Sequence, residues 1–207
     1  DRIKRLSPDA VGLSVYAHFF QYAGEITRHI RKELNIPVIW GGVHPTLCPE
    51  ECIQIADMIC VGEGEEAVLE LAQRMSEKKD ITNIRNIWVR DKDKIFRNDL
   101  RPLLQDLDTL PFPDPLSENN YFICADKRYK TLQKPLYSIM ASRGCPHRCT
   151  YCSEISLQEI YKLRNYRKRS VKNVMDELIK VRENKNISSL LFLDPVFPYD
   201  IEWVSSF

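Results

Sequence analysis

The chain has 207 residues, of which 43% are hydrophobic and 29% are charged, and its formal net charge is +1. This length and composition support one large or two small domains with a hydrophobic core. The balanced charge gives no general attraction to nucleic acid, and no apolar run is long enough to span a bilayer. We therefore expect neither a membrane nor a nucleic acid as partner.

No secretory signal is visible at the N-terminus, and seven cysteines then suit a reducing, cytoplasmic compartment. The chain begins at Asp1 without Met and stops at Phe207, shortly after a strand-like run. We therefore expect it to be a piece of a longer protein.

Residues 10–78 alternate between strand and helix patterns. Strands are expected at 10–15, 37–40 and 57–61, and helices at 21–34, from Pro49 onward, and at 65–75. The helical period places Ile26, Ile30 and Leu34 on one face of the first helix, and Val68, Leu69, Ala72 and Met75 on one face of the last. This β-α-β-α-β order predicts a parallel sheet, which binds ligands at the carboxyl ends of its strands.

The rest of the chain divides at a proline-rich segment. Residues 86–97 predict a β-hairpin that closes the first domain, residues 1–100. The segment 101–134 is expected to be an extended linker. In the second domain, residues 135–207, we expect a strand at 136–141, a helix capped by Ser170 that runs to about 183, and a strand at 189–193.

Three cysteines, Cys145, Cys149 and Cys152, lie on one short loop that follows the strand at 136–141. Three thiolates at this spacing can hold three irons of a [4Fe–4S] cluster and leave the fourth iron open. A zinc site would want a fourth protein ligand, and a disulfide would leave an odd thiol. The spacing therefore favours an iron–sulfur site with an open coordination position.

Ser142-Arg143-Gly144, followed by this cysteine triplet with Tyr151 before its last member, resembles the radical S-adenosylmethionine (SAM) enzymes. The resemblance implies that Cys145, Cys149 and Cys152 ligate the cluster and that SAM chelates the open iron. It also implies that Tyr151 lies beside the SAM adenine. In that family, one electron from the cluster cleaves SAM to a 5′-deoxyadenosyl radical. Such a cluster is oxygen-sensitive, so we expect an anaerobic or protected setting.

Asp194 ends the second strand of the C-terminal half, so we expect it at the same rim as the cysteine loop. Leu193-Asp194-Pro195 stands where the family usually has a glycine-rich element, and it resembles the acidic strand end of cobalamin-dependent members. The resemblance implies a contact with the SAM amino group. The alternative is a structural turn cap, because Asp before Pro commonly starts a turn.

The segment Gly62-Glu63-Gly64-Glu65-Glu66-Ala67 fits a dinucleotide-binding pattern after a strand and before a helix. We reject NAD or FAD, because three glutamates at that helix start would repel a pyrophosphate. No acidic strand end follows about 20 residues later to hold a ribose. A carboxylate-rich helix start instead suits the positive end of the helix dipole.

The loops at 11–16, 40–46 and 61–65, together with the linker Leu110-Pro111-Phe112-Pro113, resemble the cobalamin-binding domain found upstream of many radical SAM domains. Glycines let a backbone approach a bulky ligand closely. The alternative is a domain of this type that no longer binds cobalamin. The resemblance implies a group of cobalamin contacts: Ser14, Tyr16, Gly41, Gly42, His44, Gly62 and Gly64.

The fold implied is α/β: part of a flavodoxin- or Rossmann-like cobalamin-binding domain, then the start of a partial (β/α)6 TIM-type radical SAM barrel. The function implied is radical methylation of an unactivated carbon. A radical SAM cyclase or rearrangement enzyme without methyl transfer is the first alternative. A non-enzymatic iron–sulfur or cobalamin-binding protein is another.

A tRNA methylthiotransferase is a further alternative, but it would need a second cluster from Cys48, Cys52 and Cys60. Cys48 and Cys52 sit at helical spacing and Cys60 lies inside an apolar strand, so we interpret all three as structural. The basic stretch 162–169 is interpreted as a solvated face, from which one arginine could reach the SAM carboxylate. We expect a small-molecule substrate and a reductant such as flavodoxin or ferredoxin.

Overall fold

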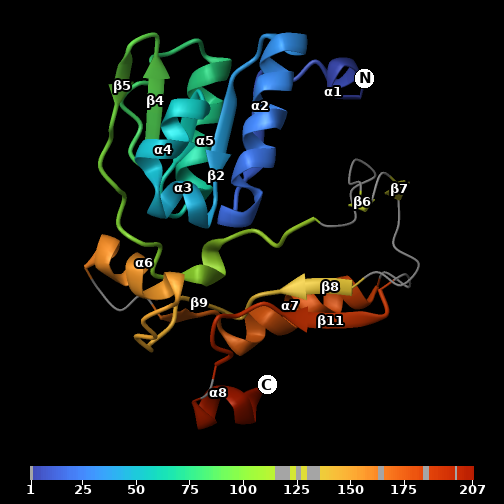
Figure 1. The fold of residues 1–207 in the computed structure, drawn as a ribbon. Helices are drawn as coiled ribbons and strands as arrows, with labels where there is room; N and C mark the ends of the chain where they lie inside the picture. Colours follow the sequence, from blue (N-terminus) through green and yellow to red (C-terminus); the bar gives the residue numbers. More distant parts are fainter. Residues whose placement is uncertain are drawn as a thin grey trace. The chain divides into compact units, whose positions relative to one another are not determined.

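In the computed structural model, the residues described are 2–114, 122–124, 127–129, 136–162, 166–183, 187–198 and 200–207 (Figure 1). The chain divides into two compact units. The N-terminal unit comprises residues 1–103 and Tyr151–Tyr161, and the C-terminal unit comprises Leu104–Thr150 and Lys162–Phe207. Parts of the predicted linker 101–134, and Arg164 in the basic stretch, lie outside the described residues.

The N-terminal unit contains a five-stranded sheet in the order β1-β2-β3-β4-β5. The first three strands are parallel, and the last two form the predicted antiparallel hairpin. The strand bounds are β1 (Val11–Ser14), β2 (Val38–Gly41), β3 (Met58–Cys60), β4 (Ile87–Asp91) and β5 (Lys94–Phe96). This arrangement confirms the predicted α/β fold with a parallel-rich sheet.

Helices connect the parallel strands, as the β-α-β-α-β pattern predicts (Figure 1). A short helix between β2 and α4 was not foreseen, and it places Cys48 at the start of α4. The helical segments of this unit are α1 (Arg2–Leu6), η1 (Ala17–Phe19), α2 (Phe20–Leu34), α3 (Val43–Leu47), α4 (Pro49–Ile55), α5 (Glu65–Ser76) and α6 (Ser153–Tyr161).

The core of the N-terminal unit lies on both faces of the sheet. Val38 and Trp40 of β2 pack with Ile59 of β3 against α2 and α4. Met58 and Cys60 of β3 pack instead with α5. Because successive strand residues point to opposite faces, this short strand contributes to both layers. Burial on both faces explains its continuous apolar sequence.

Helix α2 buries the predicted face only in part: Ile30 is buried and Leu34 packs against the core, but Ile26 does not. Its buried residues include Ala23, Thr27 and Ile30, whereas Ile26 is 47% exposed. The large indole of Trp40 lies in the same cluster as Ala23 and Ile30. Ala23, Thr27 and Ile30 therefore face the sheet beside this ring, and Ile26 is turned outward.

The predicted apolar face of α5 was also wrong in part. Val68 and Leu69 are 46% and 59% exposed, and Met75 is only partly buried. This helix carries apolar residues on several sides, so its period alone does not select the side that meets the sheet. The residues that it buries are Ala67 and Leu71.

The C-terminal unit pairs β8 with β11 in parallel, in the register Leu136↔Ser189. Helix α7 lies between these strands in sequence, and the Ser170 hydroxyl accepts a 3.0 Å hydrogen bond from the Asn173 N–H at its start. This confirms the predicted cap. The elements of this unit are η2 (Leu107–Thr109), β6 (Phe122–Cys124), β7 (Lys127–Tyr129), β8 (Leu136–Ile139), β9 (Ser142–Arg143), β10 (Arg167–Lys168), α7 (Val171–Arg182), β11 (Ser189–Phe192) and α8 (Ile201–Ser206).

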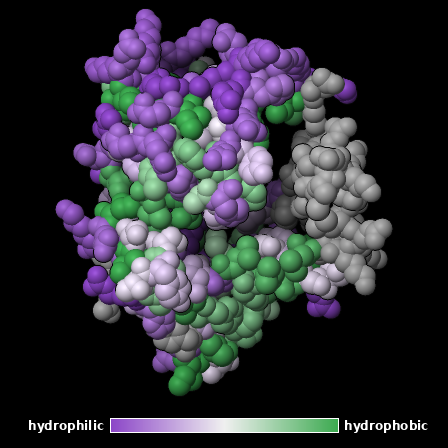
Figure 2. Space-filling model, viewed as in Figure 1, coloured by the Kyte–Doolittle hydropathy of each residue, from purple (hydrophilic) through white to green (hydrophobic). Residues whose placement is uncertain are grey.

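The sheet of the C-terminal unit has unlike faces. Tyr137 and Ile139 of β8 are buried with residues of α7, whereas Leu136 and Met140 are 45% and 42% exposed. Leu190 and Leu191 of β11 are exposed as well. Figure 2 shows green, apolar surface on the visible side of this unit. Among the described residues, no helix is both long and apolar enough to cross a membrane.

Thr27 provides a test of the N-terminal core. Its hydroxyl donates to the Ala23 carbonyl and accepts from the Trp40 indole N–H, each at 2.8 Å, and both side chains are buried. Thr27→Val keeps the shape but leaves the indole N–H without a partner. We expect the free energy of unfolding in urea to fall by about 1–3 kcal/mol. Thr27→Ser, which keeps the hydroxyl, is the matched control; a valine variant as stable as the serine variant would contradict this account.

Candidate functional site

The glycine-bearing loops follow the three parallel strands of the N-terminal unit, so they lie at one edge of its sheet. The Val15 N–H donates to the Gly41 carbonyl at 2.8 Å, which joins the first loop to the second. Thr46 joins the second loop to the third: its hydroxyl donates to the Gly42 carbonyl at 2.8 Å and accepts from the Gly62 N–H at 3.0 Å. Sequence reasoning missed Thr46, although its position one turn after the glycine pair was a usable signal.

Gly42 is required by the close approach of two loops. Its φ is +97°, and a Cβ there would lie 3.0 Å from the Ser14 hydroxyl oxygen and 3.2 Å from the Val15 nitrogen. A side chain at this position would therefore strain the backbone and press on the first loop. Packing within the protein is enough to explain this glycine, whatever ligand lies beyond it.

Gly62 is covered by a residue from a distant part of the chain. The Glu63 N–H donates to the hydroxyl of Tyr161, at the end of α6, over 3.1 Å. A Cβ on Gly62 would lie 1.9 Å from that hydroxyl oxygen, and the φ of Gly62 is +84°. Buried Asn86 supports the same loop through a 2.7 Å hydrogen bond to the Val61 carbonyl. Tyr161 and Asn86 carried no motif, so sequence reasoning missed both.

The remaining predicted cobalamin contacts differ in exposure. Ser14 is exposed, and Tyr16 is 52% exposed with its ring stacked near His18. Gly64 is the N-cap residue of α5, and its carbonyl accepts from the Val68 N–H at 2.8 Å. The structure therefore places these residues on the loops after β1 and β3, and their contact with cobalamin stays a prediction.

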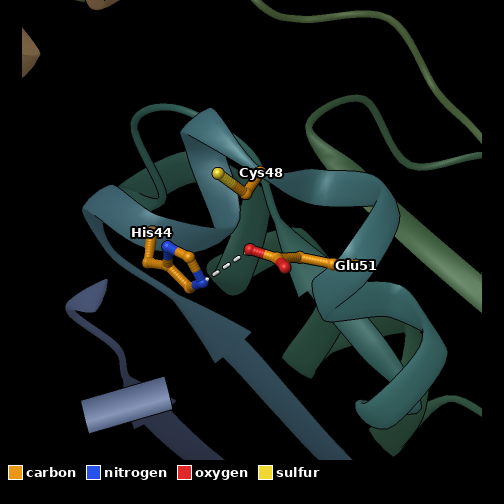
Figure 3. A group of neighbouring side chains, drawn as sticks. All are labelled: His44, Cys48 and Glu51. Atoms are coloured by element: carbon orange, nitrogen blue, oxygen red, sulfur yellow. Dashed lines mark ion pairs between the residues drawn. The ribbon is translucent and has the colours of Figure 1, made fainter. Parts of the chain in front are cut away.

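His44, Cys48 and Glu51 form a cluster across α3 and α4 (Figure 3). The His44 ring is nearly buried, its Nε2 lies 3.0 Å from Glu51 Oε1, and the Phe20 ring meets it edge-on. Burial, followed by the charge of Glu51, raises the pKa of the Cys48 thiol. Among the described residues, these three offer ligand atoms within 4.8 Å of one another. Glu51 lies at ion-pair distance from His44 Nε2, a buried atom that makes no hydrogen bond within the described part of the chain.

Cys52 and Cys60 belong to different layers of the core. Cys52 packs in the cluster beneath α2 and α4, whereas Cys60 packs beneath α5 on the opposite face of the sheet. A strand of the sheet separates the two layers, so these thiols do not face a common space. Their placement supports the structural interpretation and opposes a second cluster formed with Cys48.

The cysteine triplet lies on the loop between β9 and α6. Cys145 is buried and its sulfur accepts from the His147 N–H at 3.4 Å, Cys149 is exposed, and Cys152 is partly exposed. The boundary between the two units falls inside this loop, after Thr150. The donor set fits: three sulfur ligands within eight residues are what an iron–sulfur cluster with one open iron requires.

The two predicted SAM contacts are placed differently. Tyr151 is 90% exposed, so its ring is open to a ligand. The carboxylate of Asp194 instead accepts hydrogen bonds from the chain, at the Ala141 and Ser142 N–H groups. The structure thus supplies a structural partner for Asp194, and the contacts of both residues with SAM stay predictions.

A cavity of about 170 Å³ in the C-terminal unit is lined by Arg169, Glu177 and the linker residue Phe112. Glu177 is buried; its carboxylate accepts from the Tyr137 hydroxyl and pairs with Arg169, each at 2.5 Å. Burial, and then the bond to Glu177, raise the pKa of Tyr137. Arg169 also lies over the Phe112 ring. This arginine is thus held by a buried carboxylate beside the cavity.

Gly62→Ala should destabilise the N-terminal unit, because the added Cβ meets the Tyr161 hydroxyl and the backbone has positive φ. We expect a loss of about 1–3 kcal/mol in the free energy of unfolding, measured in urea. Gly41→Ala is the matched control, since the nearest atom to its Cβ would be 3.8 Å away, an ordinary contact. Equal stability of the two variants would show that Gly62 is not confined in this way.

The buried cysteines should resist alkylation. Burial raises the pKa of Cys52 to about 12 and that of Cys60 to about 11, so both thiols stay protonated near neutral pH. Because the thiolate is the reactive form, iodoacetamide at about pH 8 should spare both and modify exposed Cys149 in the cluster-free folded chain. Peptide mass spectrometry measures the sites, with the urea-unfolded chain as control. Equal labelling of Cys60 and Cys149 in the folded chain would contradict the burial of Cys60.

Comparison with known proteins relates the chain to cobalamin-binding proteins. Residues 1–72 match the model of the B12 binding domain family. The chain is 32% identical over 201 residues to an uncharacterized methyltransferase of Pyrococcus horikoshii, a match that covers 94% of this chain and 41% of that relative. It is 27% identical over 203 residues to the anaerobic magnesium-protoporphyrin IX monomethyl ester cyclase of Rubrivivax gelatinosus, covering 94% of this chain and 35% of that relative. The chain thus spans less than half the length of these relatives.

Solved structures show the same fold over nearly the whole chain. The cobalamin-dependent SAM radical enzyme OxsB, with aqua-cobalamin and SAM bound, matches with a TM-score of 0.73 and 21% identity, covering 99% of this chain and 28% of that chain. The radical SAM methyltransferase TsrM of Kitasatospora setae, with tryptophan and a SAM analog bound, matches with a TM-score of 0.68 and 20% identity, covering 99% of this chain and 41% of that chain. Residues 1–72 thus match the B12 binding domain family, and the chain as a whole has the fold seen in these two solved enzymes.

Proposed function

We propose that this chain is the cofactor-binding part of a cobalamin-dependent radical SAM enzyme that methylates an unactivated carbon of a small-molecule substrate. One observation carries the proposal: a B12-binding domain match over residues 1–72 and a Cys-x3-Cys-x2-Cys loop at 145–152 occur in the same chain. When bound, the [4Fe–4S] cluster supplies the electron for SAM cleavage, and cobalamin supplies a carrier for the methyl group.

The chain's own residues prepare the two sites. Cys145, Cys149 and Cys152 would hold the cluster, and the short loop keeps the three sulfur donors close in sequence. At the edge of the N-terminal sheet, the loops after β1, β2 and β3 come together at the carboxyl ends of parallel strands, where sheets of this kind bind ligands. Hydrogen bonds through Thr46 hold two of these loops together before any ligand arrives.

Methyl transfer is favoured by the similarity to two methyltransferases, the uncharacterized one of Pyrococcus horikoshii and the cytidylyl-2-hydroxyethylphosphonate methyltransferase of Streptomyces wedmorensis. The second candidate is radical cyclisation without methyl transfer, which the similarity to the cyclase of Rubrivivax gelatinosus favours. The two reactions form different products from SAM. Methyl transfer forms S-adenosylhomocysteine and 5′-deoxyadenosine together, whereas cyclisation forms 5′-deoxyadenosine without S-adenosylhomocysteine.

A methylthiotransferase would need a second cluster, and the separation of Cys52 from Cys60 opposes this. Iron analysis separates the two, with about four irons per chain for one [4Fe–4S] cluster and about eight for two. We further propose a flavodoxin or ferredoxin as electron donor and the cytoplasm as the compartment, because an open cluster needs a reductant and protection from oxygen.

Replacing Cys145, Cys149 or Cys152 with Ala should remove most of the bound iron and abolish formation of 5′-deoxyadenosine from SAM. The physical reason is that a cluster with an open iron has only three protein ligands, so removal of one ligand releases the cluster from the protein. Cys52→Ala is the matched control, since that buried thiol lies in the core of the N-terminal unit. Iron content and chromatography of the nucleoside products measure the outcome. A triplet variant that retains both would refute the assignment.

Cobalamin content is measured on the same full-length protein, purified anaerobically from cells supplied with the vitamin. We expect about one cobalamin per chain, because a B12-binding domain holds one corrinoid. An intact cluster without any cobalamin would refute the two-cofactor proposal and leave the N-terminal unit with another role.

A further inference from the structure

The end of β11 is tied to the base of the cysteine loop. Asp194 Oδ2 accepts from the Ala141 N–H at 3.2 Å, and Oδ1 accepts from the Ser142 N–H at 2.5 Å. The Ser142 hydroxyl lies 2.6 Å from the same Oδ1 and 2.9 Å from the Val196 carbonyl oxygen, either of which can accept its proton. All four residues belong to the C-terminal unit.

Strand pairing brings these groups together. β8 and β11 are parallel and end in the pair Ile139↔Phe192, after which the Leu193 N–H donates to the Ile139 carbonyl at 2.9 Å. Ala141 and Asp194, two residues beyond the ends of their strands, are therefore neighbours. Beyond the ladder the N–H groups of Ala141 and Ser142 need new acceptors, and an ionised carboxylate provides strong ones.

Further hydrogen bonds fix the chain at Ala141 and Ser142. Ser142 is buried and pairs with Lys168 in the β9–β10 ladder, and the Ala141 carbonyl accepts from the Arg169 N–H at 2.9 Å. Only Arg143 and Gly144 separate Ser142 from Cys145. Three residue steps span at most about 11 Å, so the fixed residue Ser142 limits where the first cysteine can lie.

We propose that Asp194 is a positioning residue for the cluster, which fixes the base of the loop and with it the sulfur of Cys145. This inference rests on the proposed function, since it assumes that the triplet holds a cluster. It differs from the direct SAM contact expected from the sequence. The Ala141 and Ser142 N–H groups already bond one to each carboxylate oxygen, so Asp194 has a structural task that does not require SAM.

Asp194→Asn is the most direct test in the full-length protein. Both carboxylate oxygens accept backbone N–H groups, so an amide of the same shape must turn its NH2 toward one of these donors. We expect iron loss to a chelator to become about 10- to 100-fold faster, as for other residues that support metal ligands. We also expect an altered electron paramagnetic resonance spectrum of the reduced cluster before SAM is added.

Asp108→Asn is the matched control. This aspartate lies in the same unit and also accepts a backbone N–H, from Ser170 at 2.9 Å, at the start of α7 rather than at the cysteine loop. It should lose iron at the parent rate and keep the parent spectrum. If Asp194→Asn does not fold, Ser142→Ala removes only the hydroxyl donor and should accelerate iron loss in the same direction, by a smaller factor.

The outcomes separate this inference from the alternatives. Parent-like iron retention and spectrum in Asp194→Asn, with weaker SAM binding, would make Asp194 a SAM ligand and overturn the positioning role. Parent-like iron retention in Ser142→Ala would also overturn the positioning role of Asp194. A parent protein that keeps its cluster but forms no 5′-deoxyadenosine would defeat the proposed function, while the rate of iron loss would still decide the role of Asp194.

Discussion

Parallel pairing of neighbouring strands is the constraint on which the rest of this structure depends. In the N-terminal unit it brings the loops after β1, β2 and β3 to one edge, and in the C-terminal unit it brings the ends of β8 and β11 together. Parallel strands require crossover connections, and the helices that provide them also cover the sheet. The residues proposed to bind cofactors thus gather where the hydrogen-bonded ladders stop.

Where a ladder stops, backbone N–H groups lose their partners, and this chain satisfies them with side chains from other segments. Thr46 accepts from Gly62, Asp194 accepts from Ala141 and Ser142, and the Tyr161 hydroxyl accepts from Glu63. Each of these bonds has a second effect, because it fixes the position of a loop. Loops that hold a cofactor in a defined orientation need this rigidity, and here it comes from ordinary demands of backbone hydrogen bonding.

The sequence was sufficient for the order and type of most elements, because apolar period and turn residues are local signals. It was not sufficient for the faces of the helices. Ile26 and Leu69 are as apolar as the residues that α2 and α5 bury, yet both point to solvent. The buried face is the one that makes tertiary contacts, and in α2 it carries Thr27, which bonds the Trp40 indole.

The cysteine triplet and the glycine-bearing loops were determined by the sequence alone, because spacing and backbone freedom are properties of a short segment. The supporting residues were decided by the tertiary structure. Tyr161 lies 98 positions from Glu63, and Asp194 lies 52 positions from Ser142. Neither pair shares a motif, since a hydrogen bond between distant segments leaves no periodic trace in a sequence. Only folding, which brings strand ends and a helix end to the same loops, shows which polar side chains position them.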